Sequence, residues 1–246
     1  MDSFDPGLMT LHTHSDFSDG QASLTAMTAA LRNAGFTCIG FADHYADERL
    51  ATIAGRIGRA GLPAYMHVAR NVGVAAGVEA EILDSGKVAI EPEERRQVDY
   101  VIGGLHRLDG VRFFDDPTPI PDPTAFVDRL RTVLIAAIES GAVDCIAHPT
   151  KLPDAIRADS GELLDSHWRR PLLAAAARAG VAFDLNEDSL VPDAAFVIDC
   201  RHAGVHILIG SDAHSLAEAR PLLYVRAVAA EAGLRPDDLF LPDRQR

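Results

Sequence analysis

Nine side chains of this sequence are of the types that bind divalent metal ions, and they occur in short motifs spread along the chain. The nine are His12, His14, Asp19, His44, Glu79, His106, His148, Asp212 and His214. Imidazole combined with carboxylate suits Zn, Mn or Fe, whereas a set made only of oxygen ligands suits Mg or Ca. Nine ligands are too many for one tetrahedral ion. The set therefore predicts two or three divalent ions, with one carboxylate bridging two of them.

Two of the motifs hold candidate ligands that are two residues apart. Side chains with this spacing on a β-strand point to the same face. His12 and His14 are therefore expected to bind the same ion, and Asp212 and His214 repeat the spacing near the end of the chain.

The motifs lie at the ends of seven segments that we predict to be β-strands. These segments are residues 8–14, 38–44, 74–81, 98–106, 143–148, 181–187 and 206–214. Several of them are nearly continuous apolar runs, which is typical of parallel strands that are covered on both faces. Each segment has a metal-binding or acid/base side chain at its C-terminal end. In a closed α/β barrel these ends meet on one face, where active sites of that architecture lie.

Alanine-rich amphipathic stretches between the strands predict helices, one of them over residues 124–140. Six glycines are predicted to end such helices, because glycine adopts the left-handed conformation at little cost. They are Gly35, Gly61, Gly141, Gly180, Gly204 and Gly233. Alternating strands and helices indicate βα units with a parallel sheet, and we expect residues 1–246 to form a single domain.

Four further histidines do not follow a predicted strand. His67, His167 and His202 fall in helical or loop stretches, and His206 begins the last strand at the opposite end of the sheet. We expect these four to lie outside the site.

Composition and charge narrow the class of protein. Of the 246 residues, 48% are hydrophobic, which excludes a disordered chain, and the net charge is −13. A surface this acidic repels a phosphate polymer, so we expect a small-molecule partner and no long nucleic acid.

The sequence also gives expectations about location. No apolar run reaches the ~18 residues of a membrane helix, and the first residues lack the pattern of a signal peptide. Cys38, Cys145 and Cys200 are scattered among apolar residues, so we expect buried, reduced thiols. These features predict a cytoplasmic protein with no membrane partner.

The motifs together resemble those of the PHP (polymerase and histidinol phosphatase) family. The first is the segment from His12 to Gly20, with the sequence HTHSDFSDG. It is followed by Ala42-Asp43-His44, Gly77-Val78-Glu79-Ala80, Gly104-Leu105-His106, Ala147-His148-Pro149 and Ser211-Asp212-Ala213-His214. The resemblance spans about residues 8–215.

This resemblance implies a distorted (β/α)7 TIM-like barrel with a trinuclear metal site at the C-terminal ends of its strands. By position, the first metal would be held by His12, His14, Glu79 and Asp212, and Glu79 would bridge to a second metal completed by His106 and His148. Asp19, His44 and His214 would hold the third metal. Among these ligands, Glu79, Asp212 and His214 are predicted to be catalytic.

The activity that the resemblance implies is metal-dependent hydrolysis of a small phosphomonoester by a metal-bridging hydroxide. Histidinol phosphate, a nucleotide and a sugar phosphate all remain open as substrates. One alternative is a phosphodiesterase or short-oligonucleotide exonuclease. Another is a non-catalytic metal-binding PHP module.

Residues beside the ligands are candidates for contacts with substrate. Arg107 and Lys151 follow two of the strand-end histidines and are predicted to bind phosphate. Asn186 ends a strand and is predicted to bind substrate or orient a ligand, and Glu81 is expected to orient a metal-bound histidine. The Pro- and Asp-rich segment 108–123 is expected to overhang the site as a loop.

Overall fold

A parallel β-barrel forms the centre of the protein in a computed structural model that describes residues 4–242. Its strands are β1 (Met9–Thr10), β2 (His12–Thr13), β3 (Cys38–Tyr45), β4 (Ala75–Glu81), β5 (Val101–Gly104), β8 (Cys145–Ile146), β9 (Ala182–Asn186) and β10 (Ile207–Ala213). The order in the sheet is β1-β3-β4-β5-β8-β9-β10-β2, and every pairing in it is parallel.

The barrel closes because its first strand is split between two neighbours. β1 pairs with β3, and β2 pairs with β10. Between them, the backbone N–H of Leu11 donates to the carbonyl of Ile209 at 2.8 Å. β1 and β2 are thus two halves of one predicted strand, and all seven predicted strands are present. The predicted distorted (β/α)7 barrel is confirmed.

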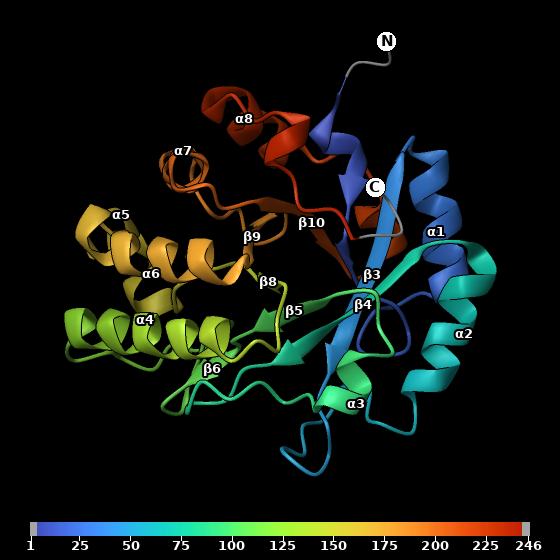
Figure 1. Cartoon of the computed structure of the whole chain (residues 1–246), viewed down its shortest axis with the longest axis horizontal. Helices are drawn as coiled ribbons and strands as arrows, with labels where there is room; N and C mark the ends of the chain where they lie inside the picture. Colours follow the sequence, from blue (N-terminus) through green and yellow to red (C-terminus); the bar gives the residue numbers. More distant parts are fainter. Residues whose placement is uncertain (1–3, 243–246) are drawn as a thin grey trace.

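Helices surround this barrel (Figure 1). They are α1 (Leu24–Asn33), α2 (Leu62–Val72), α3 (Pro92–Arg95), α4 (Pro123–Glu139), α5 (Ser160–Leu163), α6 (Ser166–Ala179), α7 (Ala194–Ala203) and α8 (Leu223–Ala232). Gly180, Gly204 and Gly233 end their helices in the left-handed conformation, as predicted. Gly61 was predicted to end a helix, but it caps the start of α2 with a negative φ. Proline at position 63 favours this helix start, since its fixed φ suits the first turn.

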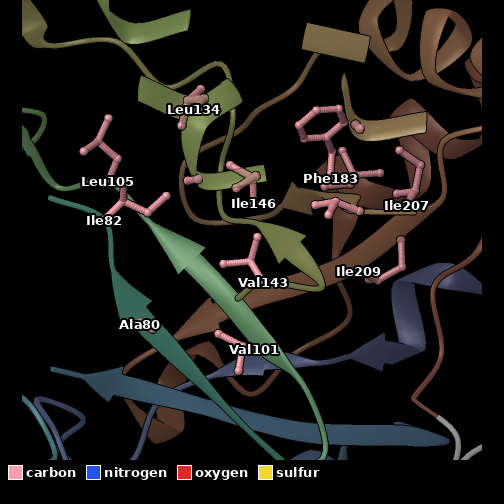
Figure 2. Packing of buried hydrophobic residues seen from close by; sticks show 14 of the residues in the cluster. Ala80, Ile82, Val101, Leu105, Leu134, Val143, Ile146, Phe183, Ile207 and Ile209 are labelled. Carbon is pink, nitrogen blue, oxygen red and sulfur yellow. The ribbon is translucent and has the colours of Figure 1, made fainter. Parts of the chain in front are cut away.

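Two apolar layers hold the strands and helices together. The inner layer fills the end of the barrel away from the strand C-termini, where Tyr100, Ile102 and Leu208 pack together. The outer layer lies between strands and helices, and Figure 2 shows Ile146 and Phe183 in it. Successive side chains of a strand point to opposite faces, so the strand residues that point inward nearer the C-terminal ends surround one central space.

Segment 108–123 contains regular structure that the sequence analysis did not predict. β6 (Arg107–Leu108) and β7 (Val111–Arg112) form an antiparallel hairpin that follows β5. The expected burial of the cysteines holds for Cys145 and Cys200, whereas Cys38 is partly exposed. Within residues 4–242, none of the helices has the length and apolar character needed to cross a membrane.

Candidate metal centre

The nine candidate ligands converge at the C-terminal ends of the barrel strands. The six histidines among them are buried or partly buried, and His12 and His14 have no exposed surface. The four histidines predicted to lie elsewhere, His67, His167, His202 and His206, are all exposed. Burial thus separates the two groups in the way that the positions of the strands predict.

Glu79 lies at the middle of this cluster and is 1% exposed. Its Oε2 atom is 2.7 Å from Nδ1 of His44 and 3.4 Å from Nε2 of His12. Its Oε1 atom is 3.1 Å from Nε2 of His106 and 3.4 Å from Nε2 of His148. One carboxylate therefore faces histidines on both of its oxygens, which is the position that a bridging ligand needs.

The ligand atoms form three groups in which all atoms lie within 4.8 Å of one another. They are His12, His14 and Asp212; His44, Glu79 and His106; and His14, Asp19, His44 and His214. The group of His12, His14 and Asp212 lies within the set predicted for the first metal. The four-residue group contains the three residues predicted for the third metal. The middle group contains His44 where the resemblance implies His148. The assignment of ligands to individual ions stays a prediction.

Several buried polar atoms of these residues have no hydrogen-bond partner, and this tests whether the residues fit metal ions. The atoms are Nε2 of His12, Nδ1 of His14, Nδ1 of His44 and both carboxylate oxygens of Glu79. A buried polar atom without a partner costs free energy. Lone pairs that face one another across a small space are suited to a cation, so the residues fit divalent metal ions.

The electrostatics of the cluster follow from the same proximity. Burial disfavours a charged imidazole, yet the Glu79 and Glu81 carboxylates outweigh it and raise the pKa of His106 to about 10. Burial also opposes ionisation of Glu79, but nearby histidines, His44 first, hold its pKa well below its usual range. Burial and the charge of His44 lower the pKa of His14 to about 3. Because a histidine binds metal in its neutral form, metal binding at this centre competes with protonation of His106.

Two of the candidate ligands have a backbone conformation that is unusual for their residue types. His148 has a φ of 32° and Asp212 a φ of 55°. Left-handed conformations of residues other than glycine store strain and cluster at functional sites. Here the surrounding barrel holds both side chains toward the centre against that strain.

Buried carboxylates behind the ligands orient the imidazole rings. Oδ2 of Asp184 lies 2.9 Å from Nδ1 of His12, and Oε2 of Glu81 lies 2.9 Å from Nδ1 of His106. A carboxylate in this position keeps Nδ1 protonated and directs Nε2 to the centre. Glu81 was expected in such a role, but Asp184 was missed by the sequence analysis. Its spacing from Asn186 repeats the two-residue pattern of the ligand pairs and could have revealed it.

We expect Asp184→Asn to weaken metal binding by about 10- to 100-fold, because the ring of His12 loses the charge that fixes its proton. Metal affinity measured by competition with a chelator checks this. Asp144→Asn is the matched control, since Asp144 accepts hydrogen bonds from Arg95 and Val101 just before β8, at the other end of the barrel. That variant should lose stability and keep its metal affinity. Equal metal affinity in the two variants would contradict the role of Asp184.

The centre lies at the floor of a pocket of about 690 Å³. Apart from candidate ligands, its lining residues are Thr52, Ile53, Ala54, Arg56, Glu81, Arg107, Arg112, Phe114 and Asp188. Of these, Arg107 was predicted as a phosphate-binding residue. Arg56, Arg112 and Asp188 were missed, because they lie in loops or in the unpredicted hairpin.

The other two predicted substrate residues occupy different surroundings. Nζ of Lys151 lies 4.5 Å from the centre of the Phe114 ring, beside the pocket. Asn186 is fully buried, and its amide nitrogen donates to Asp184 at 2.9 Å and to Asp212 at 3.1 Å. Asn186 thus donates a hydrogen bond to the candidate ligand Asp212, and its role in orienting that ligand stays a prediction.

Two curated proteins are similar to this chain in sequence. It is 26% identical over 212 residues to the DNA polymerase/3'-5' exonuclease PolX of Bacillus subtilis. The aligned region covers 84% of this chain and 34% of that protein. It is 29% identical over 152 residues to a probable phosphatase of Shewanella sediminis. The aligned region covers 58% of this chain and 52% of that protein. The chain thus spans about a third and about half of the length of these relatives.

Two solved structures share the fold. One is a candidate histidinol phosphatase of Listeria monocytogenes, with a TM-score of 0.72 and 15% identity over 85% of this chain and 96% of that chain. The other is the histidinol phosphate phosphatase of Lactococcus lactis in complex with Zn, L-histidinol and phosphate. Its TM-score is 0.69 and its identity 14%, covering 92% of this chain and 94% of that chain.

The sequence model of the PHP domain matches residues 10–188, which is well over half of the chain. This range includes seven of the nine candidate ligands, and the remaining two, Asp212 and His214, lie in the same cluster. The resemblance expected from the motifs is confirmed, and the chain belongs to the PHP domain family.

Proposed function

We propose that this protein is a metal-dependent phosphatase that hydrolyses a small phosphomonoester. The observation that carries the proposal is the set of unpartnered, buried imidazole nitrogens and carboxylate oxygens at the floor of the pocket. Such a set is suited to two or three divalent ions, with Zn, Mn or Fe favoured by its mixed ligands.

The shape and charge of the pocket support a small, anionic substrate. Its volume of about 690 Å³ is in the range of small-molecule sites. Arginine side chains border it although the chain as a whole has a net charge of −13. Three arginines in the wall of a pocket that would also hold divalent cations favour a small anion, whereas the acidic outer surface repels a long phosphate polymer.

The chain's own residues have separate roles in this proposal. Glu79, Asp212 and His214 belong to the set that would hold the ions closest to the reaction. Bound divalent ions would supply a nucleophile from water at neutral pH and neutralise charge on the phosphoryl oxygens. Lys151 is assigned to the phosphoryl group, because its ammonium group lies 4.5 Å from the centre of the Phe114 ring, which lines the pocket.

The names of relatives support the same class of reaction. The Shewanella sediminis relative is described as a probable phosphatase, and the Lactococcus lactis neighbour was solved with Zn, L-histidinol and phosphate. The location in the cytoplasm and the single domain expected from the sequence stay predictions.

A second candidate function is hydrolysis of a phosphodiester at the end of a short oligonucleotide. The match to the polymerase/exonuclease PolX over 84% of this chain favours it. The net charge of −13 argues against long strands, so only short oligonucleotides are candidates under this alternative.

Phosphate release from a panel of phosphomonoesters and a dinucleotide, with Mn²⁺ or Zn²⁺ added, separates these functions. We expect release from at least one monoester, loss of the activity with EDTA, and recovery when metal is restored. Cleavage of the dinucleotide without release from monoesters would favour the exonuclease. Metal binding without turnover of any substrate would favour the non-catalytic module.

A further inference from the structure

The β6–β7 hairpin places two arginines directly opposite each other. Its two-residue turn is Asp109-Gly110, both with positive φ, a conformation that glycine adopts at little cost. Leu108 pairs with Val111 beside the turn, and Arg107 pairs with Arg112 at the next position.

This pairing places the two side chains next to each other on one face of the hairpin. The N–H of Phe113 donates to the carbonyl of His106 at 3.0 Å, so the Arg107–Arg112 pair lies between two hydrogen-bonded positions. Facing side chains are closest at such a position, and like charges there repel. The hairpin nevertheless holds them, because Leu108 and Phe113 are buried in the core on its other face.

In the part of the chain that the structure describes, neither guanidinium forms an ion pair with a carboxylate. The Asp116 carboxylate lies near Arg112, where its Oδ2 accepts a hydrogen bond from the backbone N–H of Arg112 at 2.9 Å. Within residues 4–242, no carboxylate oxygen lies within 4.0 Å of the side-chain nitrogens of Arg107 or Arg112. Both residues line the pocket above the metal centre. Two unpaired guanidiniums on one side of a substrate pocket form a fork that suits a carboxylate or a phosphate group.

A third arginine extends this basic side of the pocket. Arg56, from the loop between β3 and α2, also lines the pocket, and its Nη2 is 3.2 Å from Oε2 of Glu81. Its buried Nε has no hydrogen-bond partner. Glu81 is already shared with His106, so it does not neutralise the other two arginines. Asp188 is the other acidic lining residue outside the ligand set.

We propose that Arg107, Arg112 and Arg56 form a subsite for a second anionic group of the substrate, separate from the phosphoryl group that is hydrolysed. This inference rests on the proposed phosphatase function and narrows the substrate to phosphomonoesters whose leaving group carries a carboxylate or another phosphate. The same arginines repel a leaving group with an amine, so the pocket disfavours cationic esters such as histidinol phosphate.

Phosphonates that cannot be hydrolysed test the subsite by binding alone. The full chain in the presence of Mn²⁺ is titrated calorimetrically with propylphosphonate, 3-aminopropylphosphonate, 3-phosphonopropionate and propane-1,3-diphosphonate. We expect the two compounds with a second anionic group to bind roughly tenfold more tightly than propylphosphonate, and the amine to bind more weakly. The stronger of the two anionic compounds identifies carboxylate or phosphate as the second group.

Arg112→Gln should reduce this preference while leaving the affinity for propylphosphonate within about twofold. Arg70→Gln is the control, because Arg70 is exposed on α2 and does not line the pocket. It should keep the preference. The subsite would be overturned by equal binding of all four compounds to the wild-type protein, by no binding of any of them, or by an equal loss of affinity for all four in Arg112→Gln. If the wild-type protein binds the two compounds with a second anionic group more tightly but releases phosphate from no monoester, the phosphatase function is refuted and the subsite stands.

Discussion

Glu79→Gln is expected to lower phosphate release by on the order of a thousandfold, because it neutralises the group on which the metal centre depends. Glu79 faces His44 and His106 on different oxygens at 2.7 and 3.1 Å. An amide of the same size keeps the packing but offers a single neutral oxygen ligand, so it cannot bridge two cations. Turnover with the best monoester and metal content measured by mass spectrometry check this together.

Glu94→Gln is the matched control for that variant. Glu94 is also a buried glutamate, 2% exposed, but it pairs with Arg49 and Arg59 outside the metal centre. Because both arginines are nearly half exposed, water screens the pairs, and the loss should be about 1–2 kcal/mol of stability. Activity per folded molecule should stay normal. A Glu79→Gln protein with full metal content and full rate would rule out the proposed bridging position.

The sequence was sufficient to predict the barrel and to predict which nine side chains gather at the metal centre. Strand ends are marked by apolar runs that stop at His, Asp or Glu, and the parallel arrangement brings those ends together. The split of the first strand at Leu11 was not predictable, because it depends on which neighbours its two halves pair with. The mistaken role of Gly61 has a local cause, since a glycine before a proline can begin a helix as well as follow one.

The basic side of the pocket illustrates what local patterns miss. Asp109-Gly110 between apolar residues is typical of a two-residue hairpin turn. Such a turn predicts the pairing of Arg107 with Arg112 that the structure has. Arg56 carries no such signal, because it lies outside any helix or strand, next to an isolated bridge between Ile57 and Tyr45. Its place beside Glu81 depends on tertiary contacts between segments 25 residues apart.

Gly104→Ala should remove activity about as completely as Glu79→Gln, although it changes no ligand. A Cβ atom on Gly104 would lie 2.3 Å from Oε1 of Glu79 and 2.6 Å from Cε1 of His106. Both distances are far inside van der Waals contact, and both groups are held by other members of the centre. One of the two ligands must therefore leave its position. Metal content and phosphate release, measured on protein with a native circular dichroism spectrum, check the prediction.

The neighbouring substitution Gly103→Ala separates this effect from general strain on β5. A Cβ atom there would point to the opposite face and lie 2.9 Å from Cγ1 of Val143 and 3.0 Å from Cδ1 of Ile82. These are the ends of apolar side chains in the outer core, which can shift at a cost of about 1–3 kcal/mol in stability. The Gly103→Ala protein should therefore unfold at a lower temperature than the wild type, yet bind metal and release phosphate normally. If both alanine variants lost metal equally, the close approach of Gly104 to Glu79 would have no special part in building the centre.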